Sequence, residues 1–260
     1  MDTAKFTHLE VGEASLETRF IPGRSDVPTL VLLHEGLGCV ALWRDFPAQL
    51  AARTGCPVLA WSRQGYGNSS PRELPWPLDY MQQEGAALSR VLDAAGVGDC
   101  ILIGHSDGAS IALVAAGSVG AARIRGLVVM APHVFTESGG LESIRAAKQA
   151  YEQGDLRQRL QKYHGANVDC AFRGWAESWL HPDFVDWNIE SFLAGIRVPV
   201  LQIQGRDDQY GTVAQLQAIA RQASTTVTTH VLEDCKHAPQ FEQPEQTLAL
   251  IAAFVADLAP

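Results

Sequence analysis

The chain has 260 residues, of which 47% are hydrophobic and 19% are charged, a balance typical of a globular protein and not of a disordered, collagen-like or coiled-coil chain. Its length suits a single α/β domain. Its 20 Lys and Arg against 29 Asp and Glu give a net charge of −9, which argues against nucleic acid or an anionic membrane surface as the main partner. A small anionic substrate is not excluded, because it responds to the local site more than to the net charge.

The N-terminal sequence has no basic start followed by an apolar run, so we expect no signal peptide. No apolar stretch reaches the roughly 20 residues that span a bilayer. The cysteines are odd in number and widely spaced, at Cys39, Cys56, Cys100, Cys170 and Cys235. This pattern indicates free thiols, and we expect a reducing, cytoplasmic location with no disulfide framework.

Short apolar runs alternate with helical stretches along the chain. The first pair of strands, His8–Val11 and Ser15–Ile21, is predicted to form an antiparallel hairpin near Gly12. Six apolar runs without alternation follow, at Thr29–His34, Pro57–Trp61, Cys100–Gly104, Gly126–Met130, Val198–Gln204 and Thr226–Leu232. Uninterrupted runs of this length are typical of strands that are covered on both faces, as in a parallel sheet.

Helices are predicted between these strands, at Ala41–Arg53, Tyr80–Ala95, Asp107–Ser118, Val213–Ala223 and Pro244–Leu258. The repeated strand–helix–strand order predicts an α/β fold with a mostly parallel, doubly wound sheet. The alternation breaks after the sixth strand, where residues 133–195 hold helical stretches such as Leu141–Gln153 and Asp155–His164. We therefore predict a core of residues 1–132 and 196–260, with a helical cap or lid inserted as residues 133–195.

The segment Gly104–Gly108 reads Gly-His-Ser-Asp-Gly and falls where a predicted strand ends and a helix begins. A serine on such a turn is held in a strained conformation with its hydroxyl exposed, and glycine two residues before and after avoids collisions. The pentapeptide arises often by chance, so its place between strand and helix decides the interpretation. We predict Ser106 as a nucleophile; the alternative is a glycine-lined turn with a capping serine.

A serine hydroxyl needs a base to become a good nucleophile. The loops Gly205–Asp208 and Asp234–Pro239 each follow a predicted strand, and both leave the same sheet edge as Ser106. We predict His237 as the base and Asp208 as the acid that fixes its tautomer. Taken singly, a loop histidine is usually solvated and two adjacent acids after a glycine usually form a turn.

These motifs resemble those of the α/β-hydrolase fold superfamily. The resemblance rests on Gly-x-Ser-x-Gly, on Gly205–Asp208, on Lys236–Pro239 and on the order nucleophile, acid, base along the chain. Arg63–Ser69 is similar to the superfamily's Arg-Gly-x-Gly-x-Ser loop, with Gln64 inserted. The resemblance covers nearly the whole chain and implies an α/β-hydrolase fold with a variable helical cap and chemistry that needs no metal or cofactor.

The loop His34–Gly38 is similar to the superfamily's oxyanion loop, in which one backbone N–H binds the developing negative charge. The resemblance implies Gly36, or Leu37 one position later, as one donor and Asp107 as the other. The sequence departs from the family pattern at Glu35, where glycine is usual.

Three residues are candidate substrate contacts. Glu35 either points away from the site and bonds backbone or Arg63, or contacts a substrate hydroxyl, an amine or a catalytic water; Coulomb repulsion of an oxyanion favours the former. Trp175 and Trp179 are four residues apart and share one helix face, which is typical of packing. Their position after a strand end, where open α/β sheets bind ligands, also suits a lid that lines a site.

Other polar side chains near these motifs are interpreted as structural. We expect His105 and His34 to be packed and Cys39 not to be a nucleophile. No metal site is predicted, because the sequence has no His-x-x-x-His or clustered Asp and His spacing.

The sequence therefore predicts a metal-free serine hydrolase that cleaves a small carboxylic ester, lactone or thioester through an acyl-enzyme. Hydrolysis of a C–C bond in a vinylogous diketone by the same triad is the alternative. A non-catalytic ligand receptor and a cofactor-free oxygenase are further readings of the fold. We expect a small-molecule substrate and leave open whether the protein is a monomer or a homodimer. The sequence does not identify the acyl or the leaving group.

Overall fold

The computed structural model describes residues 6–118 and 121–258. Residues 1–5, 119–120 and 259–260, which belong to the predicted core and include most of the N-terminal segment, lie outside the described residues. Eight strands form one sheet in the order β1-β2-β4-β3-β5-β6-β7-β8. Their bounds are β1 Thr7–Val11, β2 Ala14–Ile21, β3 Thr29–Leu33, β4 Val58–Trp61, β5 Cys100–His105, β6 Ile124–Met130, β7 Val200–Gly205 and β8 Val227–Leu232.

The sheet is parallel except at one edge. β1 and β2 form the antiparallel hairpin that the sequence predicts, and β2 pairs antiparallel with β4. Every later pair of neighbours, from β4–β3 to β7–β8, is parallel. The prediction of a mostly parallel, doubly wound sheet is therefore confirmed, and the carboxyl ends of β3 and β5 to β8 meet at one edge.

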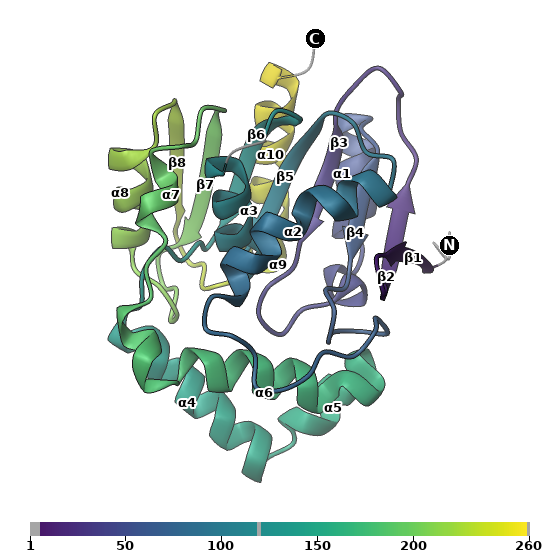
Figure 1. Ribbon diagram of the computed structural model, residues 1–260. Coiled ribbons are helices and arrows are strands. Elements are labelled where there is room, and N and C mark those ends of the chain that lie inside the picture. Colours follow the sequence, from purple (N-terminus) through teal and green to yellow (C-terminus); the bar gives the residue numbers. More distant parts are fainter. Residues whose placement is uncertain (1–5, 119–120, 259–260) are drawn as a thin grey trace.

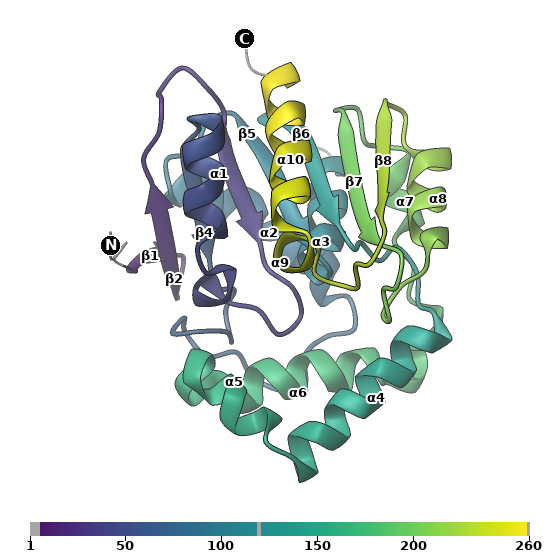
Figure 2. The same ribbon diagram turned by 180° about the vertical axis from the view of Figure 1, so that it is seen from behind.

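Helices cover both faces of this sheet (Figures 1 and 2). α2 and α3 lie on one face, and α1 and α10 lie on the other. The bounds of the α-helices are α1 Phe46–Thr54, α2 Tyr80–Ala94, α3 Asp107–Gly117, α4 Ser138–Gln153, α5 Leu156–His164, α6 Val168–Trp179, α7 Glu190–Leu193, α8 Val213–Gln222, α9 Pro239–Glu242 and α10 Pro244–Leu258. Short 3₁₀ helices span Val40–Trp43, Gly165–Asn167 and Pro182–Asp186.

One predicted helix is wrong in its extent. The sequence predicts Ala41–Arg53, but a 3₁₀ helix ends at Trp43, and α1 begins only at Phe46. Pro47 is the reason, because a proline in a helix interior removes a hydrogen bond and clashes with the preceding turn, whereas it is tolerated in the first turn. Arg44, between the two pieces, has φ +52°.

Between β6 and β7 the chain is helical, and in this fully described stretch the only strand-like pairing is an isolated bridge between Phe135 and Asn188. α4, α5 and α6 form a layer across one end of the sheet, which both views show (Figures 1 and 2). We call these three helices the helical layer. Within residues 6–118 and 121–258, no helix combines the length and apolarity required to cross a bilayer.

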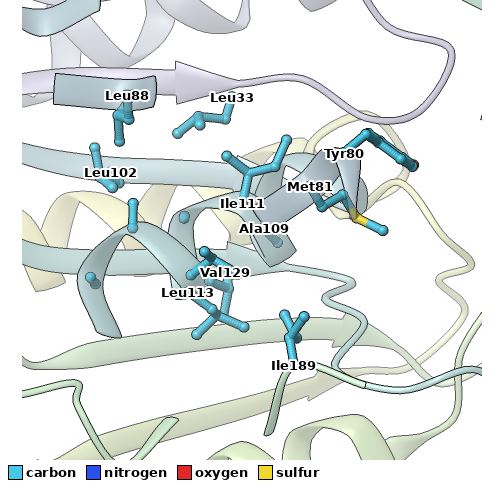
Figure 3. Packing of buried hydrophobic residues seen from close by; sticks show 14 of the residues in the cluster. Leu33, Tyr80, Met81, Leu88, Leu102, Ala109, Ile111, Leu113, Val129 and Ile189 are labelled. Carbon is cyan, nitrogen blue, oxygen red and sulfur yellow. The ribbon is translucent and has the colours of Figure 1, made fainter. Parts of the chain in front are cut away.

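The core is packed around α3, whose residues from Asp107 to Ala116 are all buried. A helix that is apolar on all sides belongs in a protein interior. Figure 3 shows Leu113 of α3 beside Val129 of β6, within the same buried cluster as Ile111 of α3 and Leu102 of β5. This packing fixes the N-terminus of α3 at the end of β5, where the predicted nucleophile lies.

Candidate active site

The predicted nucleophile lies on a strained turn between β5 and α3. Ser106 has φ +53° and ψ −121°, a conformation that non-glycine residues rarely adopt. The two glycines of the motif are needed because backbone approaches closely on both sides. A Cβ on Gly104 would lie 2.5 Å from the Cα of Ala109, and one on Gly108 would lie 2.0 Å from the carbonyl oxygen of Leu33.

The structure brings Ser106, His237 and Asp208 together in one hydrogen-bonded chain. His237 Nε2 lies 3.0 Å from Ser106 Oγ, and its Nδ1 lies 2.9 Å from each carboxylate oxygen of Asp208. In the neutral imidazole, Nδ1–H donates to the carboxylate and Nε2 accepts from the hydroxyl. This is the arrangement in which a histidine can take a proton from a serine.

The environment keeps Asp208 ionised. Burial raises the pKa of its carboxyl, but hydrogen bonding and charge interaction with His237 outweigh this and leave the pKa below its usual value. Asp208 Oδ1 also accepts from the backbone N–H of Tyr210 at 2.8 Å. Its side chain is 1% exposed, whereas the neighbouring Asp207 is exposed.

The loop between β3 and the 3₁₀ helix lies beside this chain of residues. The backbone N–H groups of Gly36 and Leu37 donate to no acceptor among the described residues. Asp107 is the first residue of α3, so its N–H is also free of intrahelical bonds. These three donors border the same cavity as Ser106. Trp175 lies against the loop, because a Cβ on Gly36 would be 2.2 Å from its indole Nε1.

Glu35 has a different partner from the one predicted. Arg63 donates to the main-chain carbonyl of Glu35 and not to its carboxylate, so the predicted Arg63 pairing is wrong. The carboxylate lies instead 3.5 Å from Nδ1 of His105, and the Glu35 side chain is 26% exposed. Burial raises the pKa of Glu35, but the interaction with His105 outweighs it and lowers the pKa to about 2.

His105 joins two loops of the site. Its ring is 3% exposed, and Nε2–H donates to the carbonyl oxygen of His237 at 2.8 Å. Burial lowers the pKa of His105, but Glu35 more than offsets this and raises the pKa above its usual value. The amide of Gln240 lies 3.0 Å from Nδ1, and its Oε1 has no other hydrogen-bond partner among the described residues. Rotation of the Gln240 amide can therefore offer a donor to the neutral His105 ring or an acceptor to the protonated one.

The side chain of Asp107 is buried under the helical layer. Tyr80 donates its hydroxyl hydrogen to Oδ2, and Trp179 donates Nε1–H to the Tyr80 oxygen at 3.1 Å. The other oxygen, Oδ1, has no hydrogen-bond partner among the described residues. Burial raises the pKa of Asp107, and the charge of Arg63 opposes that rise.

A cavity of about 120 Å³ opens at Ser106. The predicted residues Glu35, Trp175 and Trp179 all line it, so the structure brings them to the site. Residues that the sequence analysis missed complete the lining, namely His133, Glu137, Gly140, Ile144 and Tyr210. His133 lies three residues after the end of β6, and Tyr210 lies two residues after Asp208, so the rule that strand ends form the site could have found both.

The remaining polar groups lie around the site. His34 accepts from the N–H of Arg63 and donates to the carbonyl of Glu35, and burial holds its pKa well below the usual value. Cys39 is buried, and burial raises the pKa of its thiol to about 12, so the thiolate that a nucleophile requires is absent near neutral pH. In the described part of the chain, no three His, Cys, Asp or Glu side chains gather as metal ligands.

Comparison with known proteins identifies the family to which the chain belongs. The model of the alpha/beta hydrolase family matches residues 30–250. The sn-1-specific diacylglycerol lipase ABHD11 of Danio rerio is 32% identical over 94 residues, which are 36% of this chain and 28% of that protein. The match thus spans little more than a quarter of the curated relative.

Solved structures share the fold over nearly the whole chain. An esterase from Exiguobacterium antarcticum has a TM-score of 0.76 at 17% identity, covering 97% of this chain and 100% of its own. The proline iminopeptidase of Mycobacterium smegmatis has a TM-score of 0.72 at 18% identity, covering 98% and 99%. At such identities the likeness shows the fold alone, and the activities for which these two proteins are named differ.

Proposed function

Because this chain belongs to the alpha/beta hydrolase family, we propose that it is a serine hydrolase that cleaves a small carboxylic ester, lactone or thioester through an acyl-enzyme on Ser106. One observation carries the proposal. His237 lies 3.0 Å from the oxygen of Ser106 and 2.9 Å from Asp208, and the turn that presents Ser106 has a strained backbone. An ordinary capping serine needs neither the strain nor the paired histidine.

In the first half of the reaction, Ser106 Oγ attacks the substrate carbonyl as its proton passes to His237 Nε2. Asp208 stabilises the imidazolium that forms. The negative oxygen of the tetrahedral intermediate takes hydrogen bonds from Asp107 N–H and from Gly36 or Leu37 N–H, at the positive end of α3. His237 then gives its proton to the leaving oxygen or sulfur, and the acyl group stays on Ser106.

In the second half, a water molecule loses a proton to His237 and attacks the acyl carbonyl. The same N–H groups hold the second oxyanion, and the proton returns to Ser106 Oγ as the acid product leaves. In this proposal the helical layer is a lid, because Trp175 and Trp179 of α6 close the cavity over the serine.

The cavity size favours a short acyl group. About 120 Å³ lies well below the roughly 300–1,000 Å³ of sites that hold drug-sized ligands. The name of the diacylglycerol lipase relative supports ester chemistry, but a long-chain lipid exceeds this cavity as it stands.

A substrate panel with the Ser106→Ala variant tests this function. Esters, lactones and thioesters of increasing acyl length are assayed beside a vinylogous diketone whose C–C bond can be hydrolysed. We expect turnover of short-chain carboxylic substrates and a loss in kcat on the order of 10³-fold or more for Ser106→Ala, with the fold intact. Activity of that variant within tenfold of the parent contradicts the proposal, and turnover of the diketone alone replaces it with C–C hydrolysis.

A further inference from the structure

A second histidine lies in the cavity beside the one that serves as the base. His133 lines the cavity, and its ring packs against that of His237, with 5.8 Å between the ring centroids. The indole of Trp179 meets the His133 ring edge-to-face, with the centroids 5.3 Å apart. The reaction proposed above gives no role to this second imidazole.

The backbone of His133 is held in place, whereas its ring nitrogens are unused. The hydroxyl of Ser110 donates to the carbonyl oxygen of His133 at 2.6 Å and accepts from its N–H at 3.3 Å. Neither ring nitrogen makes a hydrogen bond to a described residue, and neither is among the unpartnered polar atoms that the interior encloses completely. Because His133 is 5% exposed and lines the cavity, its ring nitrogens are accessible to a ligand there. A polar group buried to this extent costs stability unless a partner bonds to it.

The protonation state of His133 limits which partner it can bind. Burial lowers the pKa of His133, and the neighbouring His237 lowers it further, to about 4, so the ring is neutral near neutral pH. A neutral imidazole has one N–H donor and one bare nitrogen that accepts, and it has no charge to attract a carboxylate or phosphate. A hydroxyl is the matching group, because it can accept from the N–H or donate to the bare nitrogen in either tautomer.

The place of His133 indicates which part of the substrate it meets. In the proposed reaction the leaving oxygen or sulfur takes its proton from Nε2 of His237, so the leaving group must lie against that ring. The ring of His133 packs against the same imidazole and borders the same cavity. A substituent one or two carbons beyond the leaving atom therefore comes within reach of His133.

Building on the proposed serine hydrolase, we propose that His133 hydrogen-bonds a hydroxyl on the leaving group of the substrate. His133 is then a binding residue that selects the alcohol or thiol and not the acyl group. An apolar leaving group would leave the buried imidazole unpaired. The inference narrows the substrate to the ester or thioester of a small alcohol or thiol that carries a further hydroxyl.

Two esters with the same acyl group test the role of the hydroxyl. In 2-hydroxyethyl acetate and propyl acetate, a hydroxyl and a methyl group stand at the same position of the leaving alcohol, and kcat/KM of the whole protein is measured for each. The ratio is divided by the ratio of their rates with hydroxide alone, which removes their difference in intrinsic reactivity. We expect a corrected preference of at least about tenfold for the hydroxyl ester, because the methyl group leaves the imidazole without a partner.

Matched variants assign the preference to His133. His133→Phe keeps an aromatic ring against Trp179 but removes both nitrogens, and it should lower the corrected preference severalfold. His230→Phe makes the same change in β8, away from the residues that line the cavity, and should leave the preference as it is. A corrected ratio near one in the parent, or a preference that His133→Phe retains in full, overturns the inference. If His133→Phe does not fold, His133→Leu replaces it, and a parent ratio near one still overturns the inference.

The binding role of His133 and the hydrolase fail separately. If the parent hydrolyses neither ester, NMR titration of the same protein still gives a Kd for each. Tighter binding of the hydroxyl ester that is lost in His133→Phe then removes the serine hydrolase and leaves the binding role of His133. Hydrolysis of both esters at equal corrected rates removes that role and leaves the hydrolase.

Discussion

Two adjacent aspartates in the loop after β7 show how single residues differ in role. Asp208 is 1% exposed in its side chain and faces His237, whereas Asp207 is exposed. The two residues lie in the turn after β7, and only the carboxylate of Asp208 reaches the imidazole.

This difference predicts unequal effects of the same substitution. Asp208→Asn should lower kcat by about 10³–10⁴-fold, because the amide favours the wrong tautomer of His237. Asp207→Asn should cost less than about tenfold, as expected for an exposed charge. The measurement is kcat of both variants near pH 7.5, with folding confirmed by circular dichroism. An inactive Asp207→Asn beside an active Asp208→Asn would place the acid one residue earlier.

The Glu35–His105 pair predicts a pH-dependent contribution to stability. The pKa of His105 is raised in the folded protein. Its contribution to stability is therefore fully present below its pKa in the unfolded chain, about 6.5, and is lost as pH rises through the folded pKa. The pKa of Glu35 is lowered to about 2. Its contribution to stability is therefore present above its pKa in the unfolded chain, about 4.3, and is lost as pH falls toward 2. The contribution is therefore greatest between about pH 5 and 6.5.

Urea unfolding of the parent and of Glu35→Gln across pH 3 to 9 measures this contribution. The stability difference between the two should peak in that window and shrink on both sides. Glu73→Gln, which removes a carboxylate from an exposed residue, is the control. A difference that is constant with pH would mean that the two side chains do not share a charge interaction.

At this scale the sequence predicts the roles that follow from position along the chain. Ser106, Asp208 and His237 each follow a strand, and strand ends meet at one sheet edge, so their meeting is predictable. The contact of Glu35 with His105 is not, because it depends on rotamers of side chains from two loops. The sequence analysis offered backbone or Arg63 as the partner, and the guanidinium of Arg63 instead donates to main-chain carbonyls.

At the scale of elements, one close approach between α6 and the loop after β3 controls the oxyanion donors. A Cβ on Gly36 would lie 2.2 Å from Nε1 of Trp175, so only glycine lets the helix and the loop meet. The need for this glycine comes from a helix far away in sequence. It could not be derived from the loop's own turn chemistry.

Gly36→Ala should therefore displace Trp175 or the loop and lower kcat/KM on the order of 10²-fold, the cost of a shift of about 1 Å at a reacting centre. Combining it with Trp175→Leu should restore part of the loss, since the smaller side chain removes the clash. Gly139→Ala, where an added Cβ meets nothing within 4 Å, should be neutral. Strictly additive losses in the Gly36 and Trp175 double variant would argue against the clash.

The predicted bounds of the strands and of one helix can be compared with the structure. The strands lie within a few residues of their predicted bounds, and five of the six apolar runs form buried parallel strands. The prediction that Thr226–Leu232 is buried is wrong, because β8 lies at the edge of the sheet and only Leu232 in it is buried. The helix predicted at Ala41–Arg53 is wrong in its start, because the ring of Pro47 allows a helix to begin there and not to pass through.

At the scale of the whole molecule, three buried histidines couple stability to pH. His34, His133 and His164 are each at most 5% exposed, and burial lowers the pKa of each, to about 4 for His133. Below the unfolded value of about 6.5 the unfolded chain binds more protons than the folded one. The contribution of these three histidines to the free energy of unfolding therefore falls as pH falls from about 6.5, opposite in sign to that of His105.

We expect the contribution of these histidines to stability to decrease between pH 6.5 and 5, since each proton that only the unfolded chain binds contributes up to about 1.4 kcal/mol per pH unit. His164→Gln should reduce this slope, although it also removes the bonds from α5 to Leu37 and Gly67. Urea unfolding at 0.5-unit steps measures the slope. An unchanged slope in His164→Gln would show that this ring is already charged in the folded protein.

The central claim is that Ser106 carries the acyl group, and quenched mass spectrometry tests it most directly. Protein mixed with a short-chain thioester or activated ester and quenched in acid within milliseconds should gain the mass of the acyl group. Digestion should place that mass on the peptide that contains Ser106, and Ser106→Ala should gain none. Turnover by the parent with no adduct at any time, or an adduct of equal yield in Ser106→Ala, would contradict the account.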